Sequence, residues 1–380
     1  MIGVNTCKVS MATPLKILFV TRKFPPAVGG MENVAAQLYD RLSQKADVRL
    51  VAITGNKGGK NILLPLAYAG LLIRAIRAGY QQRPDVIYVQ DGVMAPMALV
   101  LRMLLKRPVV ITIHGTEVAY SNPLYRLLVL PSIGRMNHAV VISQGTAERT
   151  RQVLPRLPFT KVVWGADDSF YIDADKDVLK AKLEEKLGLS LRHGPCMYLA
   201  GRLTERKGAV WFVERVMPAL VERMPSIKCL IAGEGKDGQK LATAIQRLNL
   251  ADNVIALGTV LGETRRLLYN AADLFIMPNI PGYGFEGFGM VAIEASSCGT
   301  TVVASKHEGI TDAVVEGRTG WLVPPKDTGA FIEKITDELA HPSLQRAEVR
   351  RATLETYDWD LTSDAYLRIF RDVAGSKPTI

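Results

Sequence analysis

The sequence predicts an α/β protein made of two Rossmann-like domains whose parallel sheets face a central cleft. Three observations lead to this prediction. The length of 380 residues suits two domains. Short apolar runs rich in β-branched residues alternate with helical stretches, a pattern typical of a parallel sheet covered by helices on both faces. The alternation pauses at residues 164–171 and then restarts, so two sheets are expected in succession.

The first series of strands and helices defines an N-terminal domain over residues 14–165. Its expected strands are Ile17–Thr21, Val48–Thr54, Asp85–Val89, Val109–His114 and Ala139–Ser143. A helix is expected over Met31–Ser43, and another opens at Gln144. Residues 1–13 have no apolar core of the kind a signal peptide needs, and we expect them to be a disordered leader.

The second series defines a C-terminal domain over residues 170–355. Its expected strands are Cys196–Ala200, Lys228–Ala232, Val254–Leu257, Leu274–Met277 and Thr301–Ala304. Its expected helices are Gly208–Met224, Lys236–Leu248 and Met290–Ser297. Ligands of such sheets bind outside the carboxyl ends of the strands, so the loops that follow the strands are the candidate site.

The composition excludes several classes of protein. Hydrophobic residues make up 48% of the chain and charged residues 22%, values of a packed globular protein. The four cysteines are far apart and form no C-x-x-C motif, which argues against a disulfide framework or structural zinc and suits the reducing cytoplasm. The longest apolar stretch, Ile62–Ile73, is too short to span a bilayer, which needs about 18–20 residues.

The positive charge is concentrated in the first domain. Residues 1–165 carry 21 Lys and Arg against 7 Asp and Glu, whereas residues 166–380 carry 26 against 30. Such asymmetry suggests that one face meets an anionic surface, either nucleic acid or acidic lipid. Nucleic acid is disfavoured because no recognised binding motif occurs and aromatic residues are not interleaved with the basic ones.

Three apolar segments with basic residues lie in this first domain, namely Leu63–Arg83, Ala95–Arg107 and Asn122–Arg135. Such segments can form amphipathic helices that lie in a membrane interface. They can equally be core-facing helices whose arginines reach the solvent. The first interpretation predicts an anionic membrane surface as partner, with the protein peripheral on the inner face of the cell membrane. The second predicts a cytoplasmic protein without membrane contact.

Two loops of the first domain are candidate binding elements. Gly29 and Gly30 precede a helix, where backbone N–H groups can approach an anion. The loop lacks the G-x-G-x-x-G pattern, which argues against a nicotinamide oxidoreductase. His114 ends a buried strand, where an imidazole is well placed to meet a substrate oxygen or a developing charge.

Two loops of the second domain carry the stronger signals. Arg202 and Lys207 lie in one glycine-flanked loop after a strand, and two cations in such a loop suit a diphosphate. Glu286 lies before a helix and Glu294 about one turn inside it, so both can accept hydrogen bonds from sugar hydroxyls while the helix N-terminus holds phosphate.

These motifs resemble those of a known family. GRLTERKG, IAGEG, EGFGMVAIE and CGTTVVAS occur in this order, and the sequence is similar to the retaining glycosyltransferases of family four, which have the GT-B fold. The resemblance extends over nearly the whole chain, and the last segment, residues 356–380, is expected to hold a helix that crosses back to the N-terminal domain.

The resemblance implies a transferase that moves a sugar from a nucleotide-diphosphate sugar to a hydroxyl acceptor. The basic charge and the three amphipathic segments of the first domain make a lipid or lipid-linked glycan the expected acceptor. It implies that Arg202 and Lys207 bind the diphosphate, that Glu286 holds sugar hydroxyls, and that Glu294 holds the ribose. The backbone of Phe288, Gly289 and Met290 would contact phosphate and sugar. Gly30 would meet the phosphate from the other domain, and His114 the sugar near the reacting centre.

The chain departs from the family pattern at one loop and carries no obvious metal motif. The family's GGIPE is here Glu308-Gly309-Ile310-Thr311-Asp312, and Thr301 replaces a proline. Asp173–Asp177 is the one D-x-D-like run, and it reads better as a helix cap. We therefore expect no required metal and no cofactor, since cationic side chains and a helix terminus can stabilise the leaving diphosphate.

Other functions remain open at the level of sequence. A soluble transferase with an anionic small-molecule acceptor would also use the basic domain. A phosphorylase-like enzyme of the same fold would need a cofactor lysine. A non-catalytic nucleotide-sugar binding protein would share the binding motifs without turnover.

Overall fold

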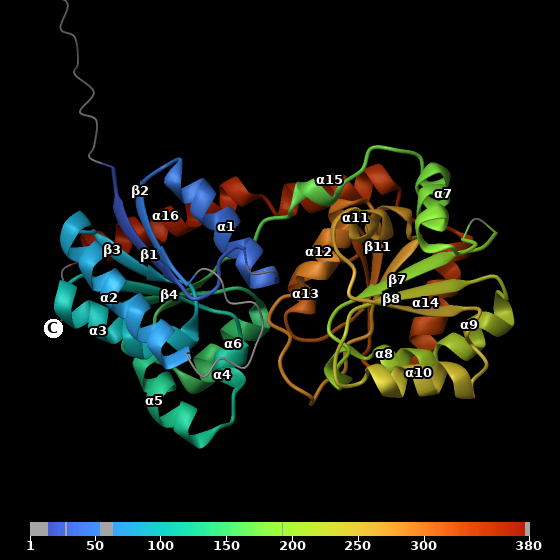
Figure 1. Cartoon of the computed structure of the whole chain (residues 1–380), viewed down its shortest axis with the longest axis horizontal. Coiled ribbons are helices and arrows are strands. Elements are labelled where there is room, and N and C mark those ends of the chain that lie inside the picture. The colour runs from blue at the N-terminus through green and yellow to red at the C-terminus, as the bar shows by residue number, and fades with distance from the viewer. Residues whose placement is uncertain (1–13, 27–28, 54–63, 192, 377–380) are drawn as a thin grey trace, which may run out of the picture.

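The computed structural model describes residues 14–26, 29–53, 64–191 and 193–376. The expected leader therefore lies outside the described residues. The chain forms two α/β domains, each built on a six-stranded sheet in which every strand is parallel to its neighbours (Figure 1). The predicted fold class is confirmed.

The first sheet has the strand order β2-β1-β3-β4-β5-β6. Its strands are β1 (Lys16–Thr21), β2 (Asp47–Ala52), β3 (Val86–Val89), β4 (Val109–Ile113), β5 (His138–Val141) and β6 (Phe159–Lys161). Ile17 of β1 pairs with Val48 on one side and Val86 on the other. The sheet is buried on both faces, which explains why its central strands are continuously apolar.

The helices of this domain divide between the two faces of the sheet. They are α1 (Gly30–Ser43), α2 (Leu64–Gln82), α3 (Ala95–Leu105), α4 (Thr116–Ala119), α5 (Pro123–Ile133) and α6 (Gln144–Val153), with a short 3₁₀ turn η1 (Gly92–Met94). Helix α1 covers one face with α16, whereas α2, α3 and α5 pack side by side over the other. All three basic amphipathic segments of the sequence are therefore helices on one side of the first domain.

The second sheet has the order β12-β11-β10-β7-β8-β9. Its strands are β7 (Cys196–Ala200), β8 (Lys228–Ala232), β9 (Val254–Gly258), β10 (Leu274–Met277), β11 (Thr301–Ser305) and β12 (Gly320–Val323). Its helical segments are η2 (Asp168–Phe170), α7 (Lys176–Leu187), η3 (Glu205–Lys207), α8 (Ala209–Arg215), α9 (Met217–Arg223), α10 (Gly238–Arg247), α11 (Gly262–Ala271), α12 (Met290–Ser297), α13 (Ile310–Ala313), α14 (Thr328–Ala340) and α15 (Arg346–Thr356).

The prediction of one helix in this domain was wrong. The stretch Gly208–Met224 forms two helices, α8 and α9, because Pro218 has no N–H to donate and its ring opposes the carbonyl one turn earlier. Two edge strands, β6 and β12, were not expected from the sequence. Both are short and neither is fully buried. β6 is Phe-Thr-Lys, and β12 has only three apolar side chains after its glycine, so each pattern is too short to predict a strand.

The last helix, α16 (Trp359–Gly375), leaves the second domain and lies along the first, beside α1 (Figure 1). Its Tyr366 hydroxyl lies 3.2 Å from the hydroxyl of Thr112 on β4, which in turn lies 2.7 Å from the hydroxyl of Tyr88 on β3. All three side chains are buried. The helix is therefore part of the core of the N-terminal domain, although it is the last element of the chain.

Candidate active site

The loops after β7 and β10 approach each other at the carboxyl end of the second sheet. Gly208, which follows η3, has a φ of 73°, and a Cβ there would lie 1.9 Å from the carbonyl oxygen of Pro278. Only glycine fits this close contact. The contact holds the cationic turn η3 directly against the loop that carries Glu286.

Glu286 is the centre of a partly buried ionic cluster. Its Oε2 accepts hydrogen bonds from Asn279 Nδ2 at 2.7 Å and from Arg206, and it pairs with Lys207 Nζ at 2.6 Å. Burial acts to raise the pKa of Glu286, but the charges of Lys207 and Arg206 outweigh it and lower that pKa. The carboxylate is therefore ionised at neutral pH and holds two cations beside it.

The sequence predicts Arg202 and Lys207 as the cations of a diphosphate site. In the structure, the two cations that contact Glu286 are Lys207 and Arg206, and the side chain of Arg202 is exposed. Nothing in the sequence singles out Arg206, because it stands in a run of charged residues that includes Glu205. The turn of η3 decides which of these side chains face Glu286.

Helix α12 starts immediately after this loop. Gly289, with a φ of 105°, precedes Met290, the first helical residue, and no side chain caps the helix N-terminus. The side chain of Phe288 is buried against Trp164, at 5.9 Å between ring centroids, and Tyr357, at 6.2 Å. Phe288 thus anchors the loop next to the N-terminus of α12, the end of a helix where N–H groups can meet an anion.

Glu294 belongs to a different cluster from Glu286. It is 5% exposed, and its Oε2 accepts hydrogen bonds from Arg265 Nη2 at 2.6 Å and from the Tyr269 hydroxyl at 2.5 Å. The Arg265 guanidinium lies 4.8 Å from the centre of the Phe170 ring. Burial acts to lower the pKa of Arg265, but the charge of Glu294 outweighs it and raises that pKa. Sequence reasoning missed Arg265 and Tyr269, whose helix carries no recognisable motif.

His114 faces this site from the first domain. Its Nε2 lies 2.6 Å from the carbonyl oxygen of Gln90, and because a carbonyl only accepts, Nε2 is the donor. Its Nδ1 is buried and has no partner among the described residues. The His114 carbonyl oxygen is so close to Gly287 that a Cβ there would lie 2.0 Å away. The loops of the two domains therefore touch beside Glu286.

Gly30 begins helix α1 and has open space where a side chain would project, since no atom lies within 4 Å of its ideal Cβ. The Glu32 carboxylate reaches back toward Gly29 and pairs with Lys23 Nζ at 2.9 Å. An anion that approached this helix terminus would therefore find both a cation and a carboxylate nearby. Residues 27 and 28 of the same loop lie outside the described residues.

The loop that departs from the family pattern contacts the site. Glu308 stands where the family has glycine, adopts a φ of 47°, and accepts a hydrogen bond from the Glu286 N–H at 2.5 Å. Asp312 binds the first domain, where it accepts from the backbone N–H of Gln144 at 2.7 Å and from Lys161 Nζ at 2.8 Å. The changed residues thus support the loop of Glu286 and connect the two domains.

No group of three or more His, Cys, Asp and Glu side chains within the described ranges is arranged to hold a metal ion. In the D-x-D-like run, Asp175 caps helix α7 by accepting a hydrogen bond from the N–H of Asp177 at 2.8 Å. This is the capping role that the sequence indicated for the run.

Comparison with known proteins identifies the class of protein that carries this site. A model described as Glycosyltransferase Family 4 matches residues 28–163, and one described as Glycosyl transferases group 1 matches residues 194–341. The chain is 27% identical over 377 residues to the GDP-mannose-dependent alpha-(1-6)-phosphatidylinositol monomannoside mannosyltransferase of Mycolicibacterium smegmatis, covering 90% of this chain and 95% of that one.

Solved structures agree in fold. Anabaena HepE in complex with UDP and glucose matches with a TM-score of 0.75 at 19% identity, over 94% of this chain and all of that one. Sucrose-phosphate synthase from Thermosynechococcus elongatus matches with a TM-score of 0.76 at 20% identity, over 94% and 99%. The chain belongs to the family-four glycosyltransferases and has the GT-B fold.

The ionic cluster makes a prediction about stability. Replacing Glu286→Gln leaves two partly buried cations without their carboxylate, so unfolding at pH 7 should cost less free energy by about 1–3 kcal/mol. Because the folded-state pKa of Glu286 is lowered, its contribution is present above the unfolded value of about 4.3 and is lost as the pH falls through the folded value.

Urea unfolding of wild type and variant at several pH values measures this difference. The gap between the two proteins should close as the solution becomes acidic. Glu222→Gln, at an exposed position on α9, should show no such gap. A gap of equal size at neutral and acidic pH would contradict the ionic role of Glu286.

Proposed function

We propose that this glycosyltransferase moves a sugar from a nucleotide-diphosphate sugar to an acceptor hydroxyl with retention of the anomeric configuration and without a metal. The observation that supports this most is the cluster of Glu286, Lys207 and Arg206 beside the uncapped N-terminus of α12. Two cations and a helix terminus at one point suit the two phosphates of a donor.

Different residues of the site are proposed to bind different parts of the donor. Lys207, Arg202 and Arg206 hold the diphosphate, together with backbone groups of Phe288, Gly289 and Met290. Glu286 accepts hydrogen bonds from hydroxyls of the transferred sugar. Glu294, kept in place by Arg265 and Tyr269, binds the ribose. Gly30 meets the phosphate from the first domain. The names of the relatives mention GDP-mannose and UDP, so the base remains open between these and ADP.

The chemistry needs stabilisation of the leaving diphosphate more than a protein nucleophile. As the bond between the anomeric carbon and the phosphate oxygen breaks, negative charge grows on the diphosphate, beside the cations of η3. The acceptor oxygen bonds to the anomeric carbon on the same face, and its proton passes to the departing phosphate oxygen. His114 contributes by offering Nδ1 to a sugar hydroxyl, since Nε2 is already committed to Gln90.

The acceptor side is proposed to be a membrane surface. Among the described residues, thirteen large apolar side chains are exposed, and nine of them lie on α2, α3 and the α4–α5 segment. The nine are Leu66, Ile73, Tyr80, Met103, Leu104, Tyr120, Leu124, Leu127 and Leu128. Among the described residues, no helix is both long and apolar enough to cross a bilayer.

This helical apolar patch also carries exposed cations, among them Arg77, Lys106, Arg107 and Arg126. The core-facing interpretation of these helices accounts for their buried sides, including Leu71 on α2, but leaves the exposed apolar side chains unexplained. Apolar side chains mixed with basic ones suit an anionic leaflet, where each cation contributes about 1 kcal/mol. We therefore place the protein on the cytoplasmic face of the cell membrane, with a lipid or lipid-linked acceptor.

Two other functions are tested against this proposal. A soluble transferase with an anionic small-molecule acceptor would use the cations of the first domain without the apolar side chains. A non-catalytic nucleotide-sugar binding protein would bind the donor without releasing nucleoside diphosphate.

The diphosphate assignment predicts a loss of turnover. Replacing Arg202 or Lys207 with Ala should lower kcat by about 100-fold or more, because their charges act most strongly on the leaving group in the transition state. Nucleoside diphosphate release from GDP-, UDP- and ADP-sugars measures this. Arg223→Ala, an exposed arginine on α9, is the control. Parental turnover by both variants would refute the assignment, and donor binding without release by the wild type would favour the non-catalytic protein.

Metal independence makes a separate prediction. Transfer should continue at the same rate in excess EDTA, because side-chain cations and a helix terminus take the place of a divalent ion. The same assay, run with EDTA and then with added Mg²⁺ or Mn²⁺, measures it. Complete loss of transfer that either ion restores would show that this part of the proposal is wrong.

Membrane attachment is tested by flotation with vesicles that contain phosphatidylglycerol. The wild type should float at low salt and float less as the salt concentration rises. The double variant Met103→Glu, Leu127→Glu should float much less, because both side chains are about two-thirds exposed on the patch. Leu361→Glu, a similarly exposed leucine on α16, is the matched control and should float like the wild type. No flotation at low salt would favour the soluble transferase.

A further inference from the structure

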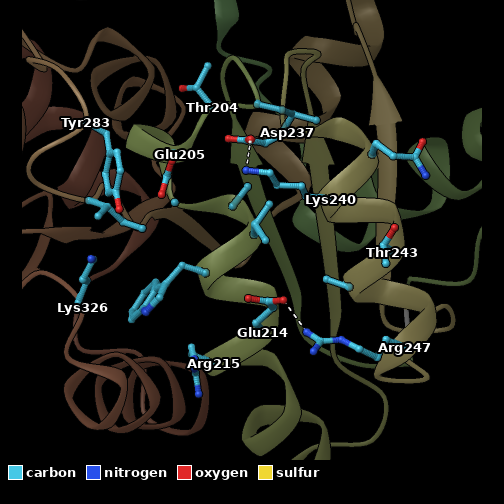
Figure 2. Close-up of a pocket in the computed structure, with 18 residues that line it drawn as sticks. Thr204, Glu205, Glu214, Arg215, Asp237, Lys240, Thr243, Arg247, Tyr283 and Lys326 are labelled. Atoms are coloured by element: carbon cyan, nitrogen blue, oxygen red, sulfur yellow. Dashed lines mark hydrogen bonds and ion pairs between the residues drawn. The ribbon is translucent and has the colours of Figure 1, made fainter.

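The second domain contains a pocket that the proposed reaction does not use. It has a volume of about 660 Å³, within the range of small-molecule sites, and lies between α8 and α10. Figure 2 shows Tyr283 and Lys326 on one side and Asp237, Lys240 and Thr243 on the other, with Glu205 and Glu214 between them. Neither Glu286 nor Glu294 lines it.

Asp237 gives the pocket an unsatisfied acceptor. The residue is 2% exposed, and its Oδ1 pairs with Lys240 Nζ at 3.1 Å. Its Oδ2 is buried and has no hydrogen-bond partner among the described residues. Buried polar atoms are almost always hydrogen-bonded, so Asp237, which lines the pocket, keeps one carboxylate oxygen able to accept from a donor once the side chain turns toward it. A hydroxyl group is such a donor.

Aromatic rings form the other side of the pocket. Tyr283 is 49% exposed, and Trp211 on α8 is partly buried. The Tyr283 hydroxyl is hydrogen-bonded to Glu205, a contact that raises the pKa of Tyr283. The faces of both rings are apolar surfaces that suit the C–H groups of a pyranose, while carboxylates nearby accept hydrogen bonds from its hydroxyls.

The charges of the pocket are close to balance. Arg247 is paired with Glu214, and Lys240 with Asp237, as the dashed lines in Figure 2 mark. A phosphate would have to compete with these carboxylates for the cations. The hydroxyl groups of a neutral molecule can instead donate hydrogen bonds to the carboxylates and accept them from the cations. We propose that this pocket is a second carbohydrate-binding site, separate from the site of transfer.

The pocket is also connected to the candidate active site through the chain. Thr204 and Glu205 stand directly before Arg206 and Lys207, and Tyr283 stands three residues before Glu286. A sugar bound in the pocket contacts both loops that form the ionic cluster. The binding site itself does not depend on the proposed reaction, because its Asp237, Trp211 and Tyr283 belong to neither the donor site nor the apolar patch.

Saturation-transfer NMR on the full chain, with mannobiose and maltose as probes, tests this proposal. At least one disaccharide should receive saturation from the wild type. Thr243→Trp, which fills the pocket from an exposed position on α10, and Tyr283→Ala, which removes the aromatic face, should each weaken binding about tenfold or more. Lys207→Ala, a change in the transfer site, should leave disaccharide binding intact.

Three outcomes would overturn the proposal. The first is that neither disaccharide receives saturation from the wild type. The second is that Lys207→Ala abolishes the signal while Thr243→Trp retains it, which would place the sugar in the transfer site. The third is that inorganic phosphate, followed by phosphorus line broadening, binds in a Thr243-dependent way while the disaccharides do not. The circular dichroism spectrum and thermal unfolding of each variant show whether it is folded.

Discussion

One continuous apolar core that passes from the first domain into the second determines the geometry of the site. It runs from Phe19 and Tyr88 of the first sheet through Trp164 to Phe288 and Tyr357 at the edge of the second. The Trp164 ring lies 5.2 Å from the His114 ring on one side and 5.9 Å from the Phe288 ring on the other. Because such packing is dense, His114 and the loop of Glu286 are held in contact rather than merely tethered.

Polar contacts also connect the two domains along this apolar core. Asp312 connects to Lys161 and to the N–H of Gln144, and its carbonyl accepts from the Tyr357 hydroxyl at 2.7 Å. The Ala166 N–H donates to the Tyr357 carbonyl at 2.7 Å. Single contacts of this kind are worth about 1 kcal/mol each. Asp312 makes several of these contacts at once. It replaces the glutamate of the family pattern, and so a carboxylate is still present where the two domains meet.

The two glutamates of the E-x₇-E run are held in place by different partners. Glu286 faces cations from η3 and an amide from Asn279, whereas Glu294 faces Arg265 and Tyr269 of α11. A carboxylate already fixed by charge-assisted hydrogen bonds loses little side-chain freedom when a ligand arrives. The structure thus holds two carboxylates in place, one before the N-terminus of α12 and one within the helix, as the proposed donor site requires.

The patterns along the chain determined the fold class, most strand positions and the loops that carry chemistry. A strand or helix can be predicted from the pattern of apolar residues within its own segment. The strand Leu274–Met277 and the helix Met290–Ser297 were predicted in this way, and the structure has both. The edge strands β6 and β12 were not predicted because a strand of three or four residues that is partly exposed has too short a pattern to be told from a loop. Lys207 and Glu286, which the resemblance assigns to one donor site, lie in contact in the structure.

Only the tertiary structure decided which neighbours those residues have. Arg206 rather than Arg202 faces Glu286 because the turn of η3 sets the directions of adjacent side chains. Arg265 on α11 reaches Glu294 on α12 across 29 residues of sequence because these two helices pack together. Lys161 on β6 reaches Asp312 on α13 across 151 residues because the two domains meet there. Periodicity says which face of a helix is buried, but the contacts between loops depend on how whole sheets and domains pack, and that is decided by residues far away in the chain.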